Sequence, residues 1–154
     1  MVVSKENLST LARAIVWFAS THKQKGRAFV LALVGDLGAG KTALVQHLAK
    51  SLEVVEVPPS PTFVLMKNYR TKSEDFKKLV HIDAYRIENK AELPPLHLER
   101  VFADDGAFVC VEWPERLFDL LPKEAFKISL ISLSETQREL KVEGELGDYL
   151  QKYI

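Results

Sequence analysis

A glycine-rich segment of eight residues constrains the fold of this chain more than any other part of its sequence. Residues 35–42 read GDLGAGKT and match the pattern G-x-x-x-x-G-K-[ST] at every defined position. They follow a continuous apolar run, 28–34, and precede a segment, 43–52, in which leucines recur at helical spacing. The sequence therefore predicts a strand, a loop and a helix in that order, which is the context in which this pattern binds phosphate.

The remaining pattern favours an α/β fold. The run 28–34 lacks polar alternation, which is typical of a strand covered on both faces in a parallel sheet, and 107–111 repeats this character. Residues 62–69 and 77–85 are strand-like and predict an antiparallel pair. We expect one domain, 1–154, with a three-layer P-loop NTPase fold around a mixed, centrally parallel sheet. Further elements are expected at 4–20 (helix), 89–102 (two short helical pieces), 114–121 (short helix), 126–133 and 139–143 (strands), and the C-terminus (helix).

Composition excludes several classes of protein. The 154 residues carry 21 basic and 21 acidic side chains, so the chain has little excess charge with which to bind nucleic acid alone. No apolar run approaches the ~20 residues of a membrane-spanning helix, and the N-terminus does not resemble a secretory signal, which predicts a cytoplasmic protein without a membrane contact. The single cysteine, Cys110, lies in an apolar run and is expected to be a buried packing residue.

The glycine-rich loop predicts a phosphate site with assigned roles. Glycines let successive backbone N–H groups point inward at phosphate oxygens, and the following helix adds its positive end. Lys41 would reach the β and γ phosphates, and the Thr42 hydroxyl would ligate Mg²⁺. The candidate ATP-binding residues of the loop are Gly35, Asp36, Leu37, Gly38, Ala39, Gly40, Lys41 and Thr42.

Two carboxylates are candidates to complete a metal site with Thr42. Asp83 lies on one face of a predicted strand together with His81 and Tyr85, and Glu112 ends the apolar strand 107–111. Ligands of open α/β sheets bind beyond the carboxyl ends of strands, so both could reach Mg²⁺. Lys41, Asp83 and Glu112 are therefore the candidate catalytic residues, while a transition-metal site at His81 and Asp83 lacks a recognisable third ligand.

Aromatic residues and a guanine-like motif bear on the nucleotide. Trp113 adjoins Glu112 and is a candidate to cover the nucleotide, whereas Trp17 fits a helical pattern and is expected in the core. Residues 89–92, NKAE, resemble the guanine-reading N-K-x-D box but follow polar sequence rather than a buried strand. ATP is therefore the favoured nucleotide.

Four motifs in register resemble the TsaE family, formerly YjeE. They are GDLGAGKT at 35–42, SPTF at 60–63, HIDAYR at 81–86 and EWP at 112–114, and the resemblance spans roughly residues 4–144. It implies a Mg²⁺-dependent P-loop ATPase that binds a TsaB-like and a TsaD-like protein in threonylcarbamoyladenosine modification of tRNA. The partner, not this chain, would be the transferase, and tRNA would be reached through the complex.

The resemblance also implies roles for residues and contains departures. Thr42 and Glu112 would bind Mg²⁺ or its water, Asp83 would act as a Walker B carboxylate, and Trp113 and Arg138 would lie near the nucleotide. Residues 60–63 would form a switch-like loop. Ala43 stands where the family often has a second Thr, and Leu8 where a base-side Thr is common, with Ser9 and Thr10 as substitutes.

Two other functions use the same loop and stay open at this point. A small-molecule kinase would need lid arginines, but the arginines here are scattered along the chain. A nucleotide-gated binding module would need ATP binding without hydrolysis. No arginine is an obvious finger, Arg86 being the best internal candidate, so slow turnover by the isolated chain is expected.

Overall fold

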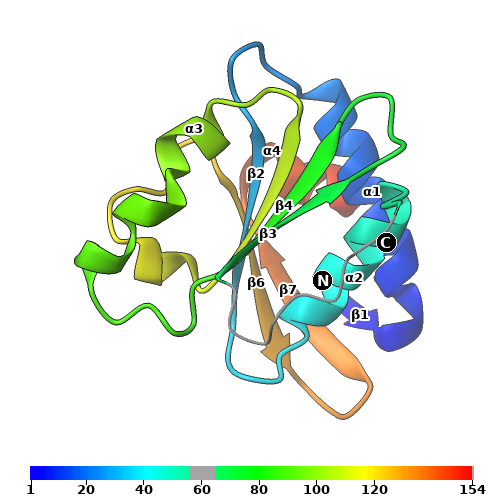
Figure 1. Ribbon diagram of the computed structural model, residues 1–154. Helices are drawn as coiled ribbons and strands as arrows, with labels where there is room; N and C mark the ends of the chain where they lie inside the picture. Colours follow the sequence, from blue (N-terminus) through cyan, green and yellow to red (C-terminus); the bar gives the residue numbers. More distant parts are fainter. Residues whose placement is uncertain (56–64, 154) are drawn as a thin grey trace.

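The computed structural model describes residues 1–55 and 65–153, which hold a seven-stranded mixed sheet (Figure 1). Its order is β1-β7-β6-β2-β5-β4-β3. The 60–63 motif, for which a switch-like loop is expected, lies outside the described residues. The strands are β1 (Val2–Ser4), β2 (Phe29–Val34), β3 (Met66–Arg70), β4 (Lys78–Asp83), β5 (Ala107–Glu112), β6 (Phe126–Ser132) and β7 (Gln137–Val142).

The middle of the sheet is parallel and its outer pairs are antiparallel. β2 lies between β5 and β6, parallel to both, and β4 is parallel to β5. The pairs β3·β4, β6·β7 and β1·β7 are antiparallel. Every residue of β5 is buried, as expected for a strand covered on both faces. The predicted mixed, centrally parallel sheet and the β3·β4 hairpin are confirmed.

Helices α1 (Leu8–Thr21), α2 (Lys41–Ser51) and α4 (Gly144–Leu150) cover one face of the sheet (Figure 1). Alternate strand residues point toward them, so Leu31 and Leu33 join this core while Val30 joins the other. The apolar residues that recur at helical spacing along α1 are buried: Leu8, Leu11, Ala12, Ile15, Phe18 and Ala19. No helix of the described ranges has both the length and the apolar character that crossing a membrane requires.

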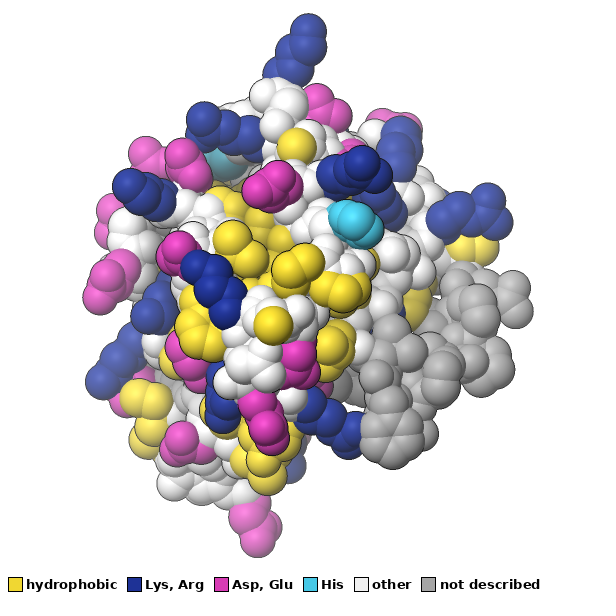
Figure 2. Space-filling model, turned by 60° about the vertical axis from the view of Figure 1, so that its left-hand side comes forward, with side chains coloured by type: hydrophobic (Ala, Val, Ile, Leu, Met, Phe, Trp, Pro, Cys, Tyr) yellow, Lys and Arg dark blue, Asp and Glu magenta, His cyan; other side chains and the backbone are white. Residues whose placement is uncertain are grey.

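Short helical segments cover the second face. The 3-10 turns Lys90–Glu92, Pro94–Leu96 and Pro114–Leu117 join α3 (Leu98–Phe102) over the core around Val80, Val109 and Val111. Two pieces were expected between 89 and 102, but the structure has three. Pro94 and Pro95 lack the N–H groups that a continuous helix needs. Hydrophobic side chains remain visible between charged ones in the view of this side (Figure 2).

Two edge features differ from the sequence-based expectations. Residues 2–4 form strand β1 beside β7, and the helix that was expected from residue 4 begins at Leu8 after a 3-10 turn, Lys5–Asn7. Trp17 was expected in the core, but it is 57% exposed and stacks on Tyr149 of α4 at 5.7 Å between ring centroids. Trp17 therefore lies at the edge of the helical layer, beside α4, rather than in the core.

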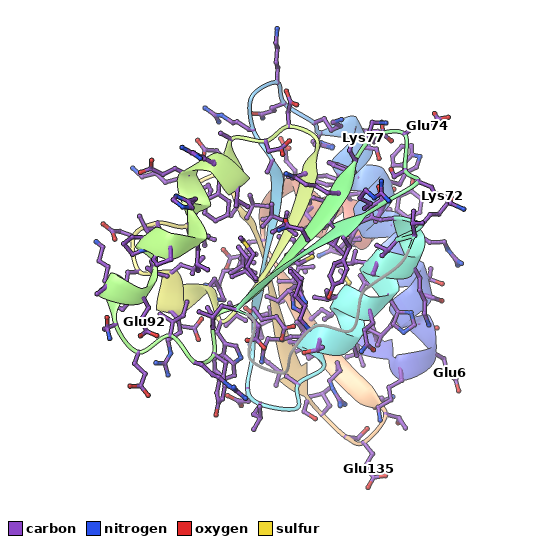
Figure 3. The ribbon with its side chains drawn as sticks, in the orientation of Figure 1. Glu6, Lys72, Glu74, Lys77, Glu92 and Glu135 are labelled. Atoms are coloured by element: carbon purple, nitrogen blue, oxygen red, sulfur yellow. The ribbon has the colours of Figure 1, made fainter. Side chains whose placement is uncertain are left out.

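Charged side chains surround the molecule, and the single cysteine is buried. Exposed charged side chains such as Glu6, Lys72, Glu74 and Glu135 project outward around the molecule (Figure 3). Cys110 is buried, as predicted, and burial, aided by the charge of Glu112, raises the pKa of its thiol. The thiolate form needed for reactivity is therefore disfavoured.

Packing of α4 on the end of β7 gives a test of the fold. A Cβ added at Gly147 would lie 2.4 Å from the carbonyl oxygen of Val142. Gly147→Ala should therefore destabilise the protein by about 1–3 kcal/mol through overpacking. Thermal unfolding measures this effect, with Asp148→Ala on the exposed side of the same helix as the control. Equal melting temperatures for the two variants would contradict this packing.

Candidate functional site

The loop between β2 and α2 presents the positive end of a helix. Gly40 is the N-cap of α2 and has φ 103°, a left-handed conformation that favours glycine. The first N–H groups of a helix lack intrahelical acceptors, and a glycine N-cap has no side chain to accept from them. These donors are therefore suited to an external anion.

Gly35 fixes where the loop leaves the sheet. It has φ 150°, and a Cβ at this position would lie 2.4 Å from the carbonyl oxygen of Leu130 in β6 and 3.1 Å from the Cβ of Ala39. Only glycine allows this approach without a shift of the backbone. The requirement for glycine at the first position of the motif is thus set by the neighbouring strand as well as by the loop.

Lys41 is 4% exposed, and its charge is met by the loop itself. Its Nζ donates hydrogen bonds to the carbonyl oxygens of Gly35 at 2.5 Å and Asp36 at 2.9 Å. The same nitrogen lies 4.1 Å from the ring centroid of Trp113, within the range of a cation–π interaction. The ammonium is therefore held beside the loop by groups that an anion could replace.

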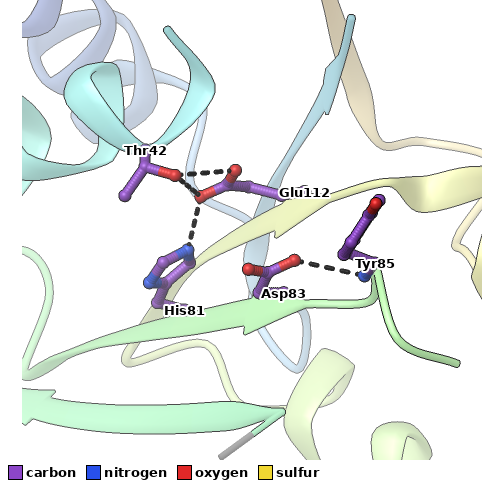
Figure 4. Close-up of polar contacts among 5 residues, drawn as sticks. All are labelled: Thr42, His81, Asp83, Tyr85 and Glu112. Atoms are coloured by element: carbon purple, nitrogen blue, oxygen red, sulfur yellow. Dashed lines mark hydrogen bonds and ion pairs between the residues drawn. The ribbon is translucent and has the colours of Figure 1, made fainter. Parts of the chain in front are cut away.

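Glu112 is 2% exposed and receives hydrogen bonds from two elements (Figure 4). The Thr42 hydroxyl lies 3.0 Å from both carboxylate oxygens. Nε2 of His81, on β4, lies 2.8 Å from Oε1. The carboxylate therefore links the first turn of α2 to the neighbouring strand.

Asp83 ends β4 at the same level of the sheet. The parallel register pairs Asp83 with Glu112 and Glu112 with Leu33, so three strands end side by side. Oδ1 of Asp83 accepts a hydrogen bond from the backbone N–H of Tyr85 at 3.1 Å (Figure 4). This bond orients the Asp83 carboxylate at the end of its strand.

A cavity of about 220 Å³ lies between the loop and these carboxylates. A larger cavity, about 490 Å³, lies where β2 and β6 begin, at the strand ends opposite to those where α/β sheets bind ligands. The smaller cavity brings together eight predicted site residues from distant parts of the chain. Its lining is Leu37, Gly38, Gly40, Lys41, Thr42, Ala43, Asp83, Tyr85, Glu112 and Trp113.

Trp113 adopts a backbone conformation that is rare for a bulky residue. It has φ 58° and ψ 53° directly before Pro114, where the left-handed region costs about 1–3 kcal/mol. In this conformation the ring contacts the Lys41 ammonium and also the Tyr85 ring, the latter at 5.1 Å between centroids. The strained residue thus forms a wall of the cavity.

Arg138 lies on the other side of the loop. Its Nε donates to the carbonyl oxygen of Ala39 at 2.9 Å, and its Nη1 donates to the carbonyl oxygens of Ser134 and Gln137. The guanidinium therefore ties the loop to the β6–β7 hairpin. A contact with nucleotide, which the sequence suggested for this residue, stays a prediction.

A second cavity of about 200 Å³ adjoins the outer side of the loop. Gly40 and Ala43 line both this cavity and the 220 Å³ cavity, so the two adjoin the same stretch of backbone. Leu8 of α1 lines it together with Arg138 and His47. Of the three residues considered for base contacts, Leu8 is the one that faces this space.

The guanine-like motif has a local structural role. Asn89 Oδ1 accepts from the N–H of Ala91, and Glu92 Oε1 accepts from the N–H groups of Glu88 and Asn89. These backbone hydrogen bonds hold the pKa of Glu92 below its usual range. The two side chains thus cap a 3-10 turn, which explains the motif without a nucleotide base.

His81 is the site residue that sequence reasoning undervalued. Strand alternation placed it on the face of Asp83, but it was considered only as half of a transition-metal pair. The structure joins its imidazole to Glu112 instead. The signal in the sequence was the position of His81 on the polar face of β4. Its partner, Glu112 on β5, could be identified only from the register of the two strands.

Comparisons with known proteins agree on one family. A family model described as "Threonylcarbamoyl adenosine biosynthesis protein TsaE" matches residues 2–140. The tRNA threonylcarbamoyladenosine biosynthesis protein TsaE of Bacillus subtilis is 37% identical over 139 residues, covering 90% of this chain and 80% of that protein. The protein of that name from Synechocystis is 38% identical over 104 residues, covering 66% of this chain and 64% of that protein.

A solved structure has the same fold. The crystal structure of Bacillus subtilis YdiB superposes with a TM-score of 0.69 and 24% sequence identity, covering 99% of this chain and 93% of that one. This likeness concerns the fold, an α/β arrangement with a mixed sheet, and the match over residues 2–140 concerns the family. The chain belongs to the TsaE family of threonylcarbamoyl adenosine biosynthesis proteins.

Proposed function

We propose that this chain is a Mg²⁺-dependent ATPase that acts in threonylcarbamoyladenosine modification of tRNA. One observation carries the enzymatic part of the proposal. The amino end of α2, the Lys41 ammonium and the Thr42–Glu112 pair meet at a single cavity beyond the carboxyl ends of parallel strands. This combination of backbone donors, a cation and a carboxylate suits a nucleoside triphosphate with its metal.

On phosphate binding, phosphate oxygens would replace the carbonyl oxygens that Lys41 contacts now. Its hydrogen bonds to the Gly35 and Asp36 carbonyl groups are made to neutral acceptors, whereas phosphate oxygens are charged and accept stronger hydrogen bonds. The first-turn N–H groups of α2 would contribute further donors. Lys41 would thus pass from the loop carbonyls to the β and γ phosphates.

The oxygen atoms around the cavity fit Mg²⁺. This ion prefers hydroxyl, carboxylate, water and phosphate oxygens, and the chain offers the Thr42 hydroxyl with the carboxylates of Glu112 and Asp83. When bound, the ion would neutralise charge on the phosphates. Thr42 and Glu112 would hold the ion or its water, and Asp83 would orient water on the side of β4.

The base and ribose would lie on the outer side of the loop. The 200 Å³ cavity and the 220 Å³ cavity adjoin each other at Gly40 and Ala43. Leu8 gives the 200 Å³ cavity an apolar contact for a base where a hydroxyl is common in the family. Arg138 would support the loop between the two cavities through Ala39 and could contact the nucleotide from there.

The pathway assignment rests on the family. The relatives from Bacillus subtilis and Synechocystis are named as tRNA threonylcarbamoyladenosine biosynthesis proteins. We propose that this chain hydrolyses ATP in a complex with a TsaD-like and a TsaB-like protein, is slow alone, and is not itself the transferase. Modification of tRNA also supports the cytoplasm as the compartment in which it works.

Removal of the Lys41 charge tests phosphate binding. Lys41→Ala should weaken ATP binding by about 10–100-fold, because a charge-assisted hydrogen bond contributes about 1.5–3 kcal/mol. Isothermal titration calorimetry measures the affinity. Lys50→Ala, at the exposed last turn of the same helix, is the control and should bind like the parent. Unchanged affinity in Lys41→Ala would contradict the assignment of the loop.

Neutralising Asp83 separates turnover from binding. Asp83→Asn keeps an oxygen that can accept from the Tyr85 N–H but removes the charge. Turnover with Mg²⁺ should fall at least about tenfold, while ATP affinity in EDTA should stay within about twofold. Asp148→Asn on α4 controls for loss of a carboxylate elsewhere. Kinetics of Asp83→Asn equal to those of the parent would contradict the assignment of Asp83 to the site. Normal cellular function of this variant despite slow turnover would favour a nucleotide-gated binding module.

A pull-down with and without ATP tests the proposed partners. The chain, used as bait in bacterial lysate, should recover a TsaD-like and a TsaB-like protein, and Lys41→Ala should recover them with an altered dependence on ATP. Mass spectrometry identifies the proteins. Recovery of neither protein under both conditions would contradict the proposed complex.

A further inference from the structure

We propose that His81 is a positioning residue of the nucleotide site, and that it holds the Glu112 carboxylate at one rotation, with one oxygen on the imidazole and the other facing the metal. The inference rests on the Mg²⁺ role proposed above for Glu112. His81 is not among the residues that line the cavity, so it acts through Glu112. It acts through a hydrogen bond from its Nε2 to Glu112 Oε1 at 2.8 Å (Figure 4).

Thr42 alone cannot set the rotation of the Glu112 carboxylate. Its hydroxyl lies 3.0 Å from Oε1 and 3.0 Å from Oε2, and it has one proton to donate. Because one proton can serve either oxygen, this contact alone does not fix the rotation of the carboxylate about its last bond. A second donor that contacts one oxygen alone fixes this rotation.

His81 is that second donor. Its Nε2 contacts Oε1, so Oε2 remains for the metal or its water. An ionised carboxylate only accepts hydrogen bonds, so the proton must reside on Nε2 of the imidazole. Hydrogen-bond partners of metal ligands orient those ligands in this way, and their loss typically costs about 10–100-fold in metal affinity or activity.

The sheet holds His81 in place for this role. In the parallel register His81 pairs with Cys110, two residues before Glu112, so the imidazole reaches forward along β5 to the carboxylate. The His81 side chain is 14% exposed and that of Glu112 is 3% exposed. This burial limits the access of water that would replace the imidazole as a donor, and a buried carboxylate without donors is costly.

Two variants test the inference. His81→Leu removes the donor, whereas His81→Gln retains an N–H at the end of its side chain. Isothermal titration calorimetry of ATP is performed with Mg²⁺ and with EDTA. His81→Leu should lose about 10–100-fold in affinity with Mg²⁺ and change less than about twofold in EDTA. His81→Gln should restore affinity with Mg²⁺ to within about threefold of the parent. His97→Asn, outside the site, is the control and should bind like the parent, since Asn tolerates the left-handed backbone of His97.

Two calorimetric results would overturn the inference. One is parent-like Mg²⁺-dependent binding in His81→Leu. The other is equal weakening of both variants in both media, which indicates a structural role only. If the parent itself showed no Mg²⁺-dependent binding, the proposed function would fail independently of His81.

A measurement on the unmodified protein keeps the test independent of variant folding. Nitrogen–proton NMR correlation of the histidine rings, recorded without nucleotide or metal, identifies which imidazole nitrogen carries the proton. The inference predicts a protonated Nε2 on His81, with the ring assigned through its correlation with the His81 backbone. An unprotonated Nε2 on His81 would overturn it.

Discussion

Two buried charges, the Lys41 ammonium and the Glu112 carboxylate, set the condition that the rest of the site must meet. They are 4% and 2% exposed, and a buried ion without partners costs several kcal/mol. Lys41 is satisfied by loop carbonyls and the Trp113 ring, and Glu112 by Thr42 and His81. Because these partners come from the loop, α2, β4 and the end of β5, the elements must assemble together for either charge to be tolerated.

Much of this arrangement could be predicted because its signals are local. The glycine-rich pattern, the apolar run before it and the leucine spacing after it each specify one part of the β2–loop–α2 unit. Parallel strands share an edge at their carboxyl ends, so Asp83 and Glu112 could be expected at the loop once both strands were recognised. The chemical roles of these residues remain proposals.

Other features depend on contacts between distant segments and could not be predicted. The three-residue strand β1 is defined by its pairing with β7, and the position of Arg138 under the loop depends on the fold of the β6–β7 hairpin. Trp17 fits the helical pattern, but periodicity does not show where the covering layer ends. The pairing of His81 with Glu112 required the β4·β5 register, which follows from the sheet rather than from either strand alone.

A crystal structure of the protein with Mg²⁺ and a non-hydrolysable ATP analogue would test the central claim most directly. The account predicts the phosphates at the amino end of α2, the Lys41 Nζ moved from the Gly35 and Asp36 carbonyl oxygens to the phosphates, and the metal within ligand distance of the Thr42 hydroxyl. An analogue bound at another surface, with Lys41 still on the loop carbonyls and the metal away from Thr42 and Glu112, would contradict it.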